Sequence, residues 1–352
     1  MSVSLPPRGR GTASNPANRF APSRSVAEDD GWFQEVPPSR ATEVRVEMAK
    51  SIITRNQSPD LPFDRSINPY RGCEHGCIYC YARPSHAYWD LSPGLDFETR
   101  LIAKSNAPSL LAQQLARPGY VCAPINLGSN TDPYQPIERQ QQLTRRTLQV
   151  LLEHRHPVTI VTKGALILRD LELLGQLAEQ RLVAVMISLT TLDDELKRIM
   201  EPRAASPAAR LRAIRVLRAQ GVPVGVLCAP MIPMINDMEL ERLLEAAKQA
   251  GAQRAAYMFL RLPREVAPLF EEWLQAHYPQ RAEHVLSLVR QSRGGALYDS
   301  RFGARMRGEG AFAALLAQRF AVASRRLGLQ GREDFELDCS RFCPPGGQLA
   351  LL

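Results

Sequence analysis

Residues 158–189 read VTIVTKGALILRDLELLGQLAEQRLVAVMISL, a stretch that contains one complete strand–helix–strand unit. The apolar, β-branched runs at 158–162 and 183–189 have the composition of buried strands. Residues 170–180, between them, carry a helical pattern of apolar residues, with Asp170 at its start as a predicted N-cap. Two strands joined by a helix within about 30 residues predict a parallel βαβ unit.

The same alternation continues on both sides of this unit. Further strands are expected near 61–69 and at 121–127, 222–228 and 255–260, and further helices at 137–154, 206–220 and 237–250. The helix at 206–220 opens with Ser206-Pro207 and stops at Gly221, which are typical start and stop signals. We predict an α/β fold over residues 46–262, a partial (β/α)6 barrel of TIM type, because a complete eight-unit barrel needs about 250 residues.

The two ends of the chain differ from this pattern. Residues 1–45 are rich in Pro, Ser, Gly, Asn and Arg without an apolar period, so we expect a flexible N-terminal arm that is mostly disordered or draped over the surface. Residues 263–352 are predicted to form a mainly helical C-terminal appendage. Its two apolar helix faces would be formed by Leu269, Phe270, Trp273 and Leu274, and by Phe312, Leu315, Leu316 and Phe320.

Composition excludes several classes of protein. The 352 residues contain no uncharged apolar run of the length that crosses a membrane, about 18 residues. The first residues have no apolar segment of a secretory signal. The seven cysteines are bunched rather than spread, which favours a reducing compartment, so we expect a cytoplasmic protein without membrane attachment.

The strongest chemical signal is Cys73-Glu-His-Gly-Cys77-Ile-Tyr-Cys80, which places three thiols within eight residues. Gly72 and Gly76 permit the backbone angles that such a loop needs. Three thiolates on a four-iron cluster leave one iron without a protein ligand and free to bind a substrate or cofactor. The alternatives are a zinc site with His75 or His86 as the fourth ligand, or three buried cysteines without a ligand. Structural zinc commonly takes two separated ligand pairs, so the pattern favours the open cluster.

The Cys-x3-Cys-x2-Cys spacing, with the aromatic Tyr79 before the third cysteine, resembles the signature of the radical S-adenosylmethionine (radical SAM) superfamily. The similarity extends from about Ile67 to Leu262. The flanking segments are similar to the spore-photoproduct-lyase-like (SplB-like) branch, which includes bacterial radical SAM proteins described as DNA repair photolyases. Those segments are INPYRGCEHGCIYCYARPSHAY (67–88), SNTDPYQPIE (129–138), VTKG (161–164), EPR (201–203) and APMIPMIND (229–237).

The resemblance implies a [4Fe-4S] cluster on Cys73, Cys77 and Cys80, with S-adenosylmethionine chelating the open iron and Tyr79 near its adenine. One electron from the reduced cluster would cleave the sulfonium bond, and the resulting 5′-deoxyadenosyl radical would abstract hydrogen from a substrate. The protein would position the cofactor and the substrate and exclude water from the reaction. An electron donor such as flavodoxin or ferredoxin is implied as a partner.

Residues at the strand ends are matched to the same cofactor. Asn130, Thr131 and Asp132 would offer oxygens to the methionine amino group, with an ordinary polar turn as the alternative. Lys163 would pair with the methionine carboxylate, unless it is a plain exposed lysine.

Three further positions carry weaker signals. Ser188 would reach the ribose or the carboxylate, or its hydroxyl is satisfied inside its strand. Arg203 would clamp a carboxylate or phosphate, or it forms a salt bridge at the start of a helix. Asn236-Asp237 reads equally well as a helix cap.

One departure narrows the expected reaction. The spore lyase carries a hydrogen-donor cysteine in a Cys-Tyr-Thr-Asp context, whereas this chain has Ser129-Asn-Thr-Asp132. Repair of the spore photoproduct itself is therefore not expected. Cys122 and Cys228 are predicted to be small core residues, and Cys339 and Cys343 an incidental pair with an open role.

The basic surplus is concentrated near the C-terminus. The net charge is +8, and residues 290–332 hold nine arginines against Asp299 and Glu309. A solvated helical face and a nucleic-acid partner are both compatible with this charge. The predicted function is a radical SAM enzyme acting on an unidentified substrate, with nucleic acid as the candidate class. The alternative is a zinc-stapled nucleic-acid-binding module without catalysis.

Overall fold

A seven-stranded sheet forms the centre of the molecule in a computed structural model, which describes residues 5–20, 41–331 and 335–344. The strand order is β10-β9-β8-β7-β6-β3-β2. The strands are β2 Ile53–Arg55, β3 Arg65–Ile67, β6 Ile125–Leu127, β7 Val158–Thr162, β8 Val183–Ser188, β9 Val224–Met231 and β10 Arg254–Phe259. β3 and β6–β10 are parallel and β2 is antiparallel. The parallel strands follow one another in chain order, which confirms the predicted partial barrel.

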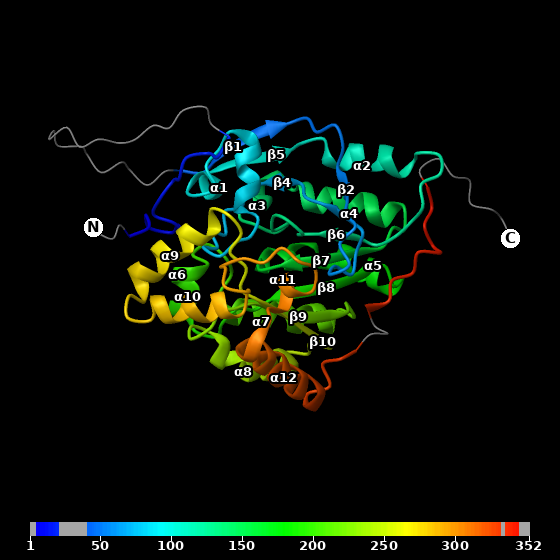
Figure 1. The fold of residues 1–352 in the computed structure, drawn as a ribbon. Helices are drawn as coiled ribbons and strands as arrows, with labels where there is room; N and C mark the ends of the chain where they lie inside the picture. Colours follow the sequence, from blue (N-terminus) through cyan, green and yellow to red (C-terminus); the bar gives the residue numbers. More distant parts are fainter. Residues whose placement is uncertain (1–4, 21–40, 332–334, 345–352) are drawn as a thin grey trace.

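Helices cover the outer face of this sheet (Figure 1). They are α2 Ala107–Leu115, α4 Leu143–Glu153, α5 Leu171–Glu179, α7 Pro207–Ala219 and α8 Leu240–Gln249. The helix α6 Asp194–Met200 lies outside this layer, with its Leu196 and Met200 buried in one cluster with Ile78. Strand residues such as Ile160, Val185 and Val226 are fully buried in one core with helix residues such as Leu174 and Leu244. The burial of apolar surface in this core holds the parallel strands together.

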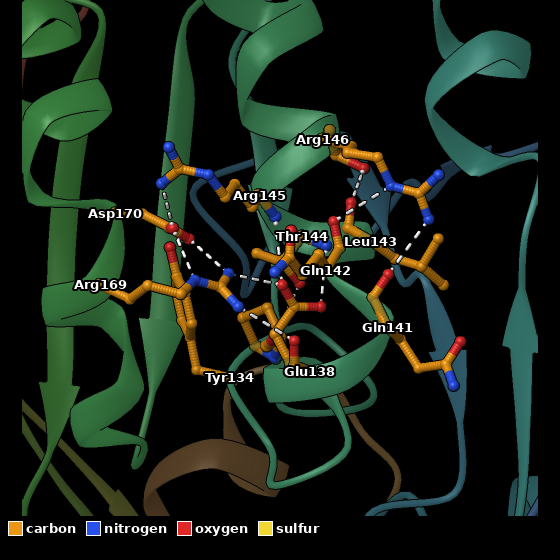
Figure 2. Close-up of polar contacts among 12 residues, drawn as sticks. Tyr134, Glu138, Gln141, Gln142, Leu143, Thr144, Arg145, Arg146, Arg169 and Asp170 are labelled. Atoms are coloured by element: carbon orange, nitrogen blue, oxygen red, sulfur yellow. Dashed lines mark hydrogen bonds and ion pairs between the residues drawn. The ribbon is translucent and has the colours of Figure 1, made fainter.

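The helix expected at 137–154 is divided in two, and Figure 2 shows the cause. A short helix α3, Glu138–Gln141, stops at Gln142, whose φ of 51° lies in the left-handed region, and α4 starts at the next residue. The Glu138 carboxylate accepts hydrogen bonds from Thr144 N at 3.0 Å and Arg145 N at 3.2 Å. A carboxylate on the first amides of α4 creates a new helix N-terminus, so the prediction of one continuous helix was wrong.

The start of α5 differs from the prediction as well. The Asp170 side chain accepts no hydrogen bond from the first backbone amides of α5, so it does not cap the helix. A short 3-10 helix, η2 Ala165–Asp170, precedes α5. Asp170 instead pairs with Arg145 and Arg169, each at 2.8 Å (Figure 2). The predicted cap at Ser206 is confirmed, because its hydroxyl accepts a hydrogen bond from Ala209 N at 3.2 Å.

A second, smaller sheet was not predicted. It has the order β1-β5-β4, with β1 Glu43–Glu47, β5 Arg100–Lys104 and β4 Tyr70–Arg71. β1 reads EVRVE and is largely exposed, so it lacks the apolar signal by which the other strands were recognised. The boundary expected at residue 45 falls inside this strand.

The C-terminal region contains four helices among the described residues, α9 Val266–His277, α10 Ala282–Gln291, α11 Ala304–Arg307 and α12 Gly310–Arg326. The predicted apolar face of α9 is buried, and its Trp273 Nε1 donates to Ile199 O at 3.0 Å. On α12 the buried stripe includes Leu316 and the partly buried Phe312 and Phe320, which are spaced by four residues. Leu315 lies beside this stripe and is 53% exposed, so its expected burial was wrong. No helix in the described ranges combines the length and the apolarity needed to cross a membrane.

Candidate functional site

The cysteine loop follows β3 and β4, at the carboxyl end of the first parallel strand. Its backbone is fixed to neighbouring segments, since Cys73 N donates to Phe97 O at 2.9 Å and Ile78 N donates to Met200 O at 3.0 Å. Gly72 has φ 73°, and a Cβ there would lie 2.5 Å from Leu101 Cδ2. Only glycine fits both the conformation and the space at this position.

The three cysteines of the loop are free thiols, and Cys73 and Cys77 are buried while Cys80 is partly buried. Burial raises the pKa of Cys73 well above its ordinary value, that of Cys77 to about 12, and that of Cys80 in the same direction. Cys77 and Cys80 each raise the pKa of Cys73 further, so the three groups act on one another. Three mutually repelling thiolates are stable in such a site only beside a strong positive charge, and a metal centre supplies one. The donor set therefore fits an iron–sulfur cluster.

The histidines proposed for a zinc site have other partners. His75 Nδ1 lies 3.3 Å from Asp132 Oδ2, and His86 Nε2 lies 3.0 Å from Arg100 O. Within residues 5–20, 41–331 and 335–344, no three His, Cys, Asp or Glu side chains converge on a position for a single metal ion. A cluster spreads its ligands over several iron atoms, so this geometry disfavours zinc more than it disfavours a cluster.

A buried ion pair supports the cysteine loop from behind. Arg83 Nε donates to Cys77 O at 3.0 Å, and its Nη2 lies 2.5 Å from Glu98 Oε1, with both side chains fully buried. Glu98 also accepts a hydrogen bond from Gly11 N at 2.9 Å, and Arg10 Nη1 donates to Glu98 O at 2.9 Å. Residues 5–20 of the expected arm therefore reach the loop, with Arg10 buried. Residues 21–40 of that arm lie outside the described residues.

Asp132 joins three segments at the ends of neighbouring strands. Its carboxylate contacts His75 and accepts hydrogen bonds from Thr162 Oγ1 at 2.6 Å and Lys163 N at 2.7 Å. Burial alone would raise the pKa of Asp132, but His75 and these hydrogen bonds together lower it to about 2. The ionised carboxylate thus ties β6, β7 and the cysteine loop together.

The polar turn before Asp132 is organised by a residue that we did not predict, Asn68. Its Oδ1 accepts hydrogen bonds from Asn130 N at 2.9 Å and Thr131 N at 3.3 Å. The side chain of Asn130 reaches Ser85 Oγ at 3.3 Å, and Thr131 Oγ1 donates to Tyr70 O at 3.1 Å. Asn68 lies in the INPYRGC segment, directly after β3. This position at a strand end is the feature of the sequence from which its role could have been predicted.

Lys163, Ser188 and Tyr79 lie together. Lys163 Nζ donates to Ser188 Oγ at 2.8 Å and lies 5.8 Å from the centre of the Tyr79 ring. The lysine charge lowers the pKa of Cys77 and Cys80 against the larger effect of burial. Two residues predicted from separate strands, Lys163 and Ser188, thus lie together with Tyr79 of the cysteine loop, close enough for the lysine charge to act on Cys77 and Cys80.

Glu201 and Arg210 complete this group and were missed by the sequence analysis. The Glu201 carboxylate accepts hydrogen bonds from the Tyr79 hydroxyl and from Thr190 Oγ1, the latter at 2.7 Å. It also pairs with Arg210, whose Nη1 donates to Ser188 O at 3.0 Å. Burial would raise the pKa of Glu201, but Arg210 and Lys163 lower it to about 2. Glu201 is the first residue of the EPR segment, in which the sequence analysis named Arg203 rather than Glu201.

Arg203 and Asn236-Asp237 have structural partners. Arg203 Nη1 lies 3.2 Å from Glu74 Oε1 of the cysteine loop, so the salt-bridge alternative describes its observed contact. Asn236 is fully buried, and its amide donates to Thr190 O and Pro230 O at 2.8 and 2.9 Å. Asp237 Oδ1 accepts from Met234 N at 2.7 Å, and neither side chain caps the following helix.

Most of the described arginines in the arginine-rich segment, residues 290–332, are paired or buried rather than part of an open basic face, although Arg307 and Arg325 are exposed. Five of its arginines pair with carboxylates of the same chain, Arg290 with Glu283, Arg301 with Asp299 and Glu309, Arg305 with Asp60, Arg319 with Glu241 and Arg326 with Glu245. Arg293 is buried and donates to Ala304 O and Leu260 O. Arg332 lies outside the described residues. Much of the charge that suggested a nucleic-acid surface is therefore neutralised within the fold.

The other cysteines lie in different surroundings. Cys228 is buried in β9, as predicted, whereas Cys122 is only partly buried and its thiol interacts with the Cys339 thiol. The expectation that Cys122 is a core residue was wrong because its strand starts later, at Ile125. The C-terminal segment is docked there, with Cys343 N donating to His154 O at 2.9 Å.

The chain is similar in sequence to proteins of several organisms. An uncharacterized protein of Mycobacterium tuberculosis is 38% identical over 233 residues, which cover 66% of this chain and 68% of that protein. An uncharacterized protein of Methanocaldococcus jannaschii is 27% identical over 62% of this chain and 78% of its own length. The radical SAM Nα-GlyT isomerase of Pseudomonas phage M6 is 22% identical over 76% of this chain and 52% of that protein.

Among solved structures, spore photoproduct lyase complexed with dinucleoside spore photoproduct shares the fold, with a TM-score of 0.59 at 13% identity over 81% of this chain and 79% of that one. Another structure of that lyase, a double mutant with bound AdoMet and the same lesion, gives a TM-score of 0.57 at 14% identity over the same shares. The family model of the radical SAM superfamily matches residues 67–247, which include all three loop cysteines. Enzymes of this superfamily use an iron–sulfur cluster, S-adenosylmethionine and a reductant. The chain belongs to the radical SAM superfamily and is a radical SAM enzyme.

Proposed function

We propose that this enzyme reductively cleaves S-adenosylmethionine at a [4Fe-4S] cluster held by Cys73, Cys77 and Cys80, and that its substrate is a nucleic acid. The observation that carries the proposal is the shared location of the three loop thiols and the group Tyr79, Lys163 and Ser188. When bound, the cluster and S-adenosylmethionine would supply a 5′-deoxyadenosyl radical for hydrogen abstraction.

The residues of the chain would bind and orient the cofactor. Lys163, with its ammonium beside Tyr79, would pair with the methionine carboxylate, and Ser188 would hold the lysine in place. Asn130 and Thr131 would accept a hydrogen bond from the methionine amino group, because the lone pairs of their side-chain oxygens remain available. Asp132 would position Lys163 through its backbone amide.

Tyr79 would lie against the adenine while Glu201 fixes its hydroxyl. Arg203 is retained as a weaker candidate for an anionic group, since it already pairs with Glu74. α9 and α10 bury the side of the loop that carries Ile78 and Tyr79, which would exclude water from a reactive intermediate.

Support for the nucleic-acid substrate comes from the shared fold with the lyase, whose structure contains a dinucleoside lesion. Ser129 stands where that lyase is expected to carry its hydrogen-donor cysteine, so a different reaction on the same class of substrate is proposed. Ser129 O accepts a hydrogen bond from the Tyr81 hydroxyl. A low-potential donor of the flavodoxin or ferredoxin class would supply the electron.

The test is anaerobic reconstitution with iron and sulfide, followed by addition of dithionite and S-adenosylmethionine. We expect about four iron atoms per chain and formation of 5′-deoxyadenosine. Cys77→Ala should abolish both, whereas the matched variant Cys343→Ser, outside the loop, should leave both unchanged. A fully loaded wild-type protein that forms no 5′-deoxyadenosine would overturn the proposal.

A further inference from the structure

Arg261 lies beside the cysteine loop and has no ion-pair partner among the described residues. It follows β10 by two residues and is partly buried. Its guanidinium carbon lies 5.0 Å from the centre of the Tyr81 ring, and Tyr81 directly follows Cys80. In parallel α/β folds, the residues just beyond the carboxyl ends of the strands form the ligand site. Arg261 thus occupies a position from which it can contact a ligand next to the cluster loop.

The hydrogen-bonding capacity of Arg261 is largely unused. Its Nε is buried without a hydrogen-bond partner, and its Nη1 has a weak contact to Met306 Sδ at 3.6 Å. In the part of the chain that the structure describes, no carboxylate pairs with it. The nearby Asp60 carboxylate feels the Arg261 charge, which helps to lower its pKa, but its hydrogen bonds go to other groups. Arg305 Nε lies 2.6 Å from its Oδ2, and Gly303 N lies 2.7 Å from its Oδ1.

A guanidinium without a counter-ion in a partly buried site is energetically unfavourable unless an anion binds it. Its planar set of donors matches the oxygens of a phosphate in a two-point contact. The buried Arg293 lies close enough for the two positive charges to oppose each other, with burial as the larger cause of the lowered pKa of Arg293. An arriving anion would relieve that repulsion.

Aromatic rings accompany the cation. Tyr298 is the second ring near the guanidinium, with its centre 5.9 Å away. Aromatic faces beside an arginine are the pattern by which proteins bind single-stranded nucleic acid, with bases stacked on the rings and the phosphate on the cation. A small carboxylate would use the arginine but not the rings, so the surroundings favour a nucleotide.

We infer that Arg261 binds a backbone phosphate of a nucleic-acid strand and places one nucleotide, flanked by Tyr81 and Tyr298, at the mouth of the cluster site. This rests on the proposed function and names the contact by which that site would hold its substrate. It assigns substrate binding to a residue outside the arginine-rich segment, whose charges are mostly paired within the chain.

The experiment measures binding of a short fluorescein-labelled oligo(dT) to the reconstituted holoprotein by fluorescence anisotropy. Arg261→Gln keeps most of the side-chain volume and removes the charge. Arg264→Gln is the matched control, because Arg264 is exposed and lies three residues further along the chain. Equal iron content and equal thermal midpoints of both variants establish that they are folded.

We expect Arg261→Gln to weaken binding about tenfold or more, and to reduce the slope of log Kd against log salt by about one between about 50 and 200 mM. Arg264→Gln should change Kd by less than about twofold. Unchanged affinity of Arg261→Gln, or absence of oligonucleotide binding by the wild-type holoprotein, overturns the inference. Displacement of the oligonucleotide by an equal concentration of dTMP would show recognition of a free mononucleotide and overturn the strand as ligand.

Failure of the proposed function is recognised separately. Wild-type holoprotein is incubated with dithionite and S-adenosylmethionine in the absence of oligonucleotide, and formation of 5′-deoxyadenosine is measured. If none forms, the proposed function itself is refuted. If it forms and Arg261→Gln binds the strand normally, only the phosphate contact is refuted.

Discussion

Glu201 and Arg210 form an ion pair in which both side chains are almost completely buried, directly behind Tyr79 of the cysteine loop. The pair holds the Tyr79 hydroxyl through Glu201 and the end of β8 through Arg210, which donates to Ser188 O. Two elements that contribute to the proposed cofactor site are therefore positioned by one electrostatic contact.

Removal of one partner of this pair should destabilise the protein strongly. Glu201→Gln leaves Arg210 as a buried charge without compensation, and we expect it to lower the free energy of unfolding by about 3–5 kcal/mol. Urea unfolding of the protein without cluster measures this change. Arg203→Gln, which breaks the more exposed contact to Glu74, should cost less than about 1 kcal/mol. Similar losses for the two variants would refute the structural role of the Glu201–Arg210 pair.

The packing of the N-terminal segment on the cysteine loop can be tested with one methyl group. A Cβ at Gly11 would lie 1.8 Å from Gly76 O, so Gly11→Ala should displace residues 5–20 from the loop. We expect faster tryptic cleavage after Arg10, which is buried in the native protein. Leu5→Ala is the control, because it changes an exposed side chain of the same segment. Equal cleavage rates in the two variants would show that the close approach of Gly11 to Gly76 does not hold the segment.

Protonation of His156 should destabilise the fold at low pH. The imidazole is fully buried between Tyr120, at 2.8 Å from Nε2, and Pro157 O, at 3.0 Å from Nδ1. Burial lowers the pKa of His156 from 6.5 to about 4. The unfolded state therefore binds the proton first, and stability is lost as the pH falls from about 6.5 towards 4, by up to about 3 kcal/mol from this group.

His156→Asn should flatten that dependence in urea unfolding measured between pH 4 and 7. Part of the slope should remain, because burial also lowers the pKa of His86 to about 4. A variant with the same slope as the wild type would contradict a neutral, buried His156.

The Cys122 and Cys339 thiols should be oxidisable to a disulfide. Their interaction brings the C-terminal segment against the chain just before β6, where the Phe342 ring also lies 5.4 Å from that of Tyr120. Diamide removes two electrons and two protons from such a pair, and peptide mapping should find Cys122 linked to Cys339. Cys343→Ser should still form this link, and Cys339→Ser should not. Exclusive linkage to Cys343 would show a different arrangement of the segment.

The sequence predicted the parts of the fold that depend on long apolar runs. The strands at 158–162 and 183–188 were found almost to the residue because both are continuous apolar, β-branched runs whose residues are buried or partly buried. The strands β1, β4 and β5 were not found. β1 is largely exposed, β4 has only two residues, and the apolar run of β5 is short, so their pairing with one another defines them. The break at Gln142 was also invisible, because it depends on where one carboxylate, that of Glu138, points.

In the candidate site, too, residues that belong to a sequence pattern were predicted, and residues that are brought in by packing were not. The spacing of the cysteines singled out the loop, and strand ends singled out Lys163 and Ser188, which the fold brings together. Glu201 and Arg210 could not be distinguished from other charged residues, since their burial and pairing arise only from the packing of α7 against β8. Arg261 carried no sequence signal apart from its position after a strand.

The central claim is that the cluster on Cys73, Cys77 and Cys80 has one iron open to S-adenosylmethionine. Electron paramagnetic resonance of the dithionite-reduced holoprotein, recorded with and without S-adenosylmethionine, tests it most directly, because a ligand on the open iron alters the electronic environment of the cluster. We expect the spectrum to change when S-adenosylmethionine is added. We expect Lys163→Met to show no such change at limiting S-adenosylmethionine. Identical spectra with and without saturating S-adenosylmethionine, in protein with a full complement of iron, would contradict the central claim.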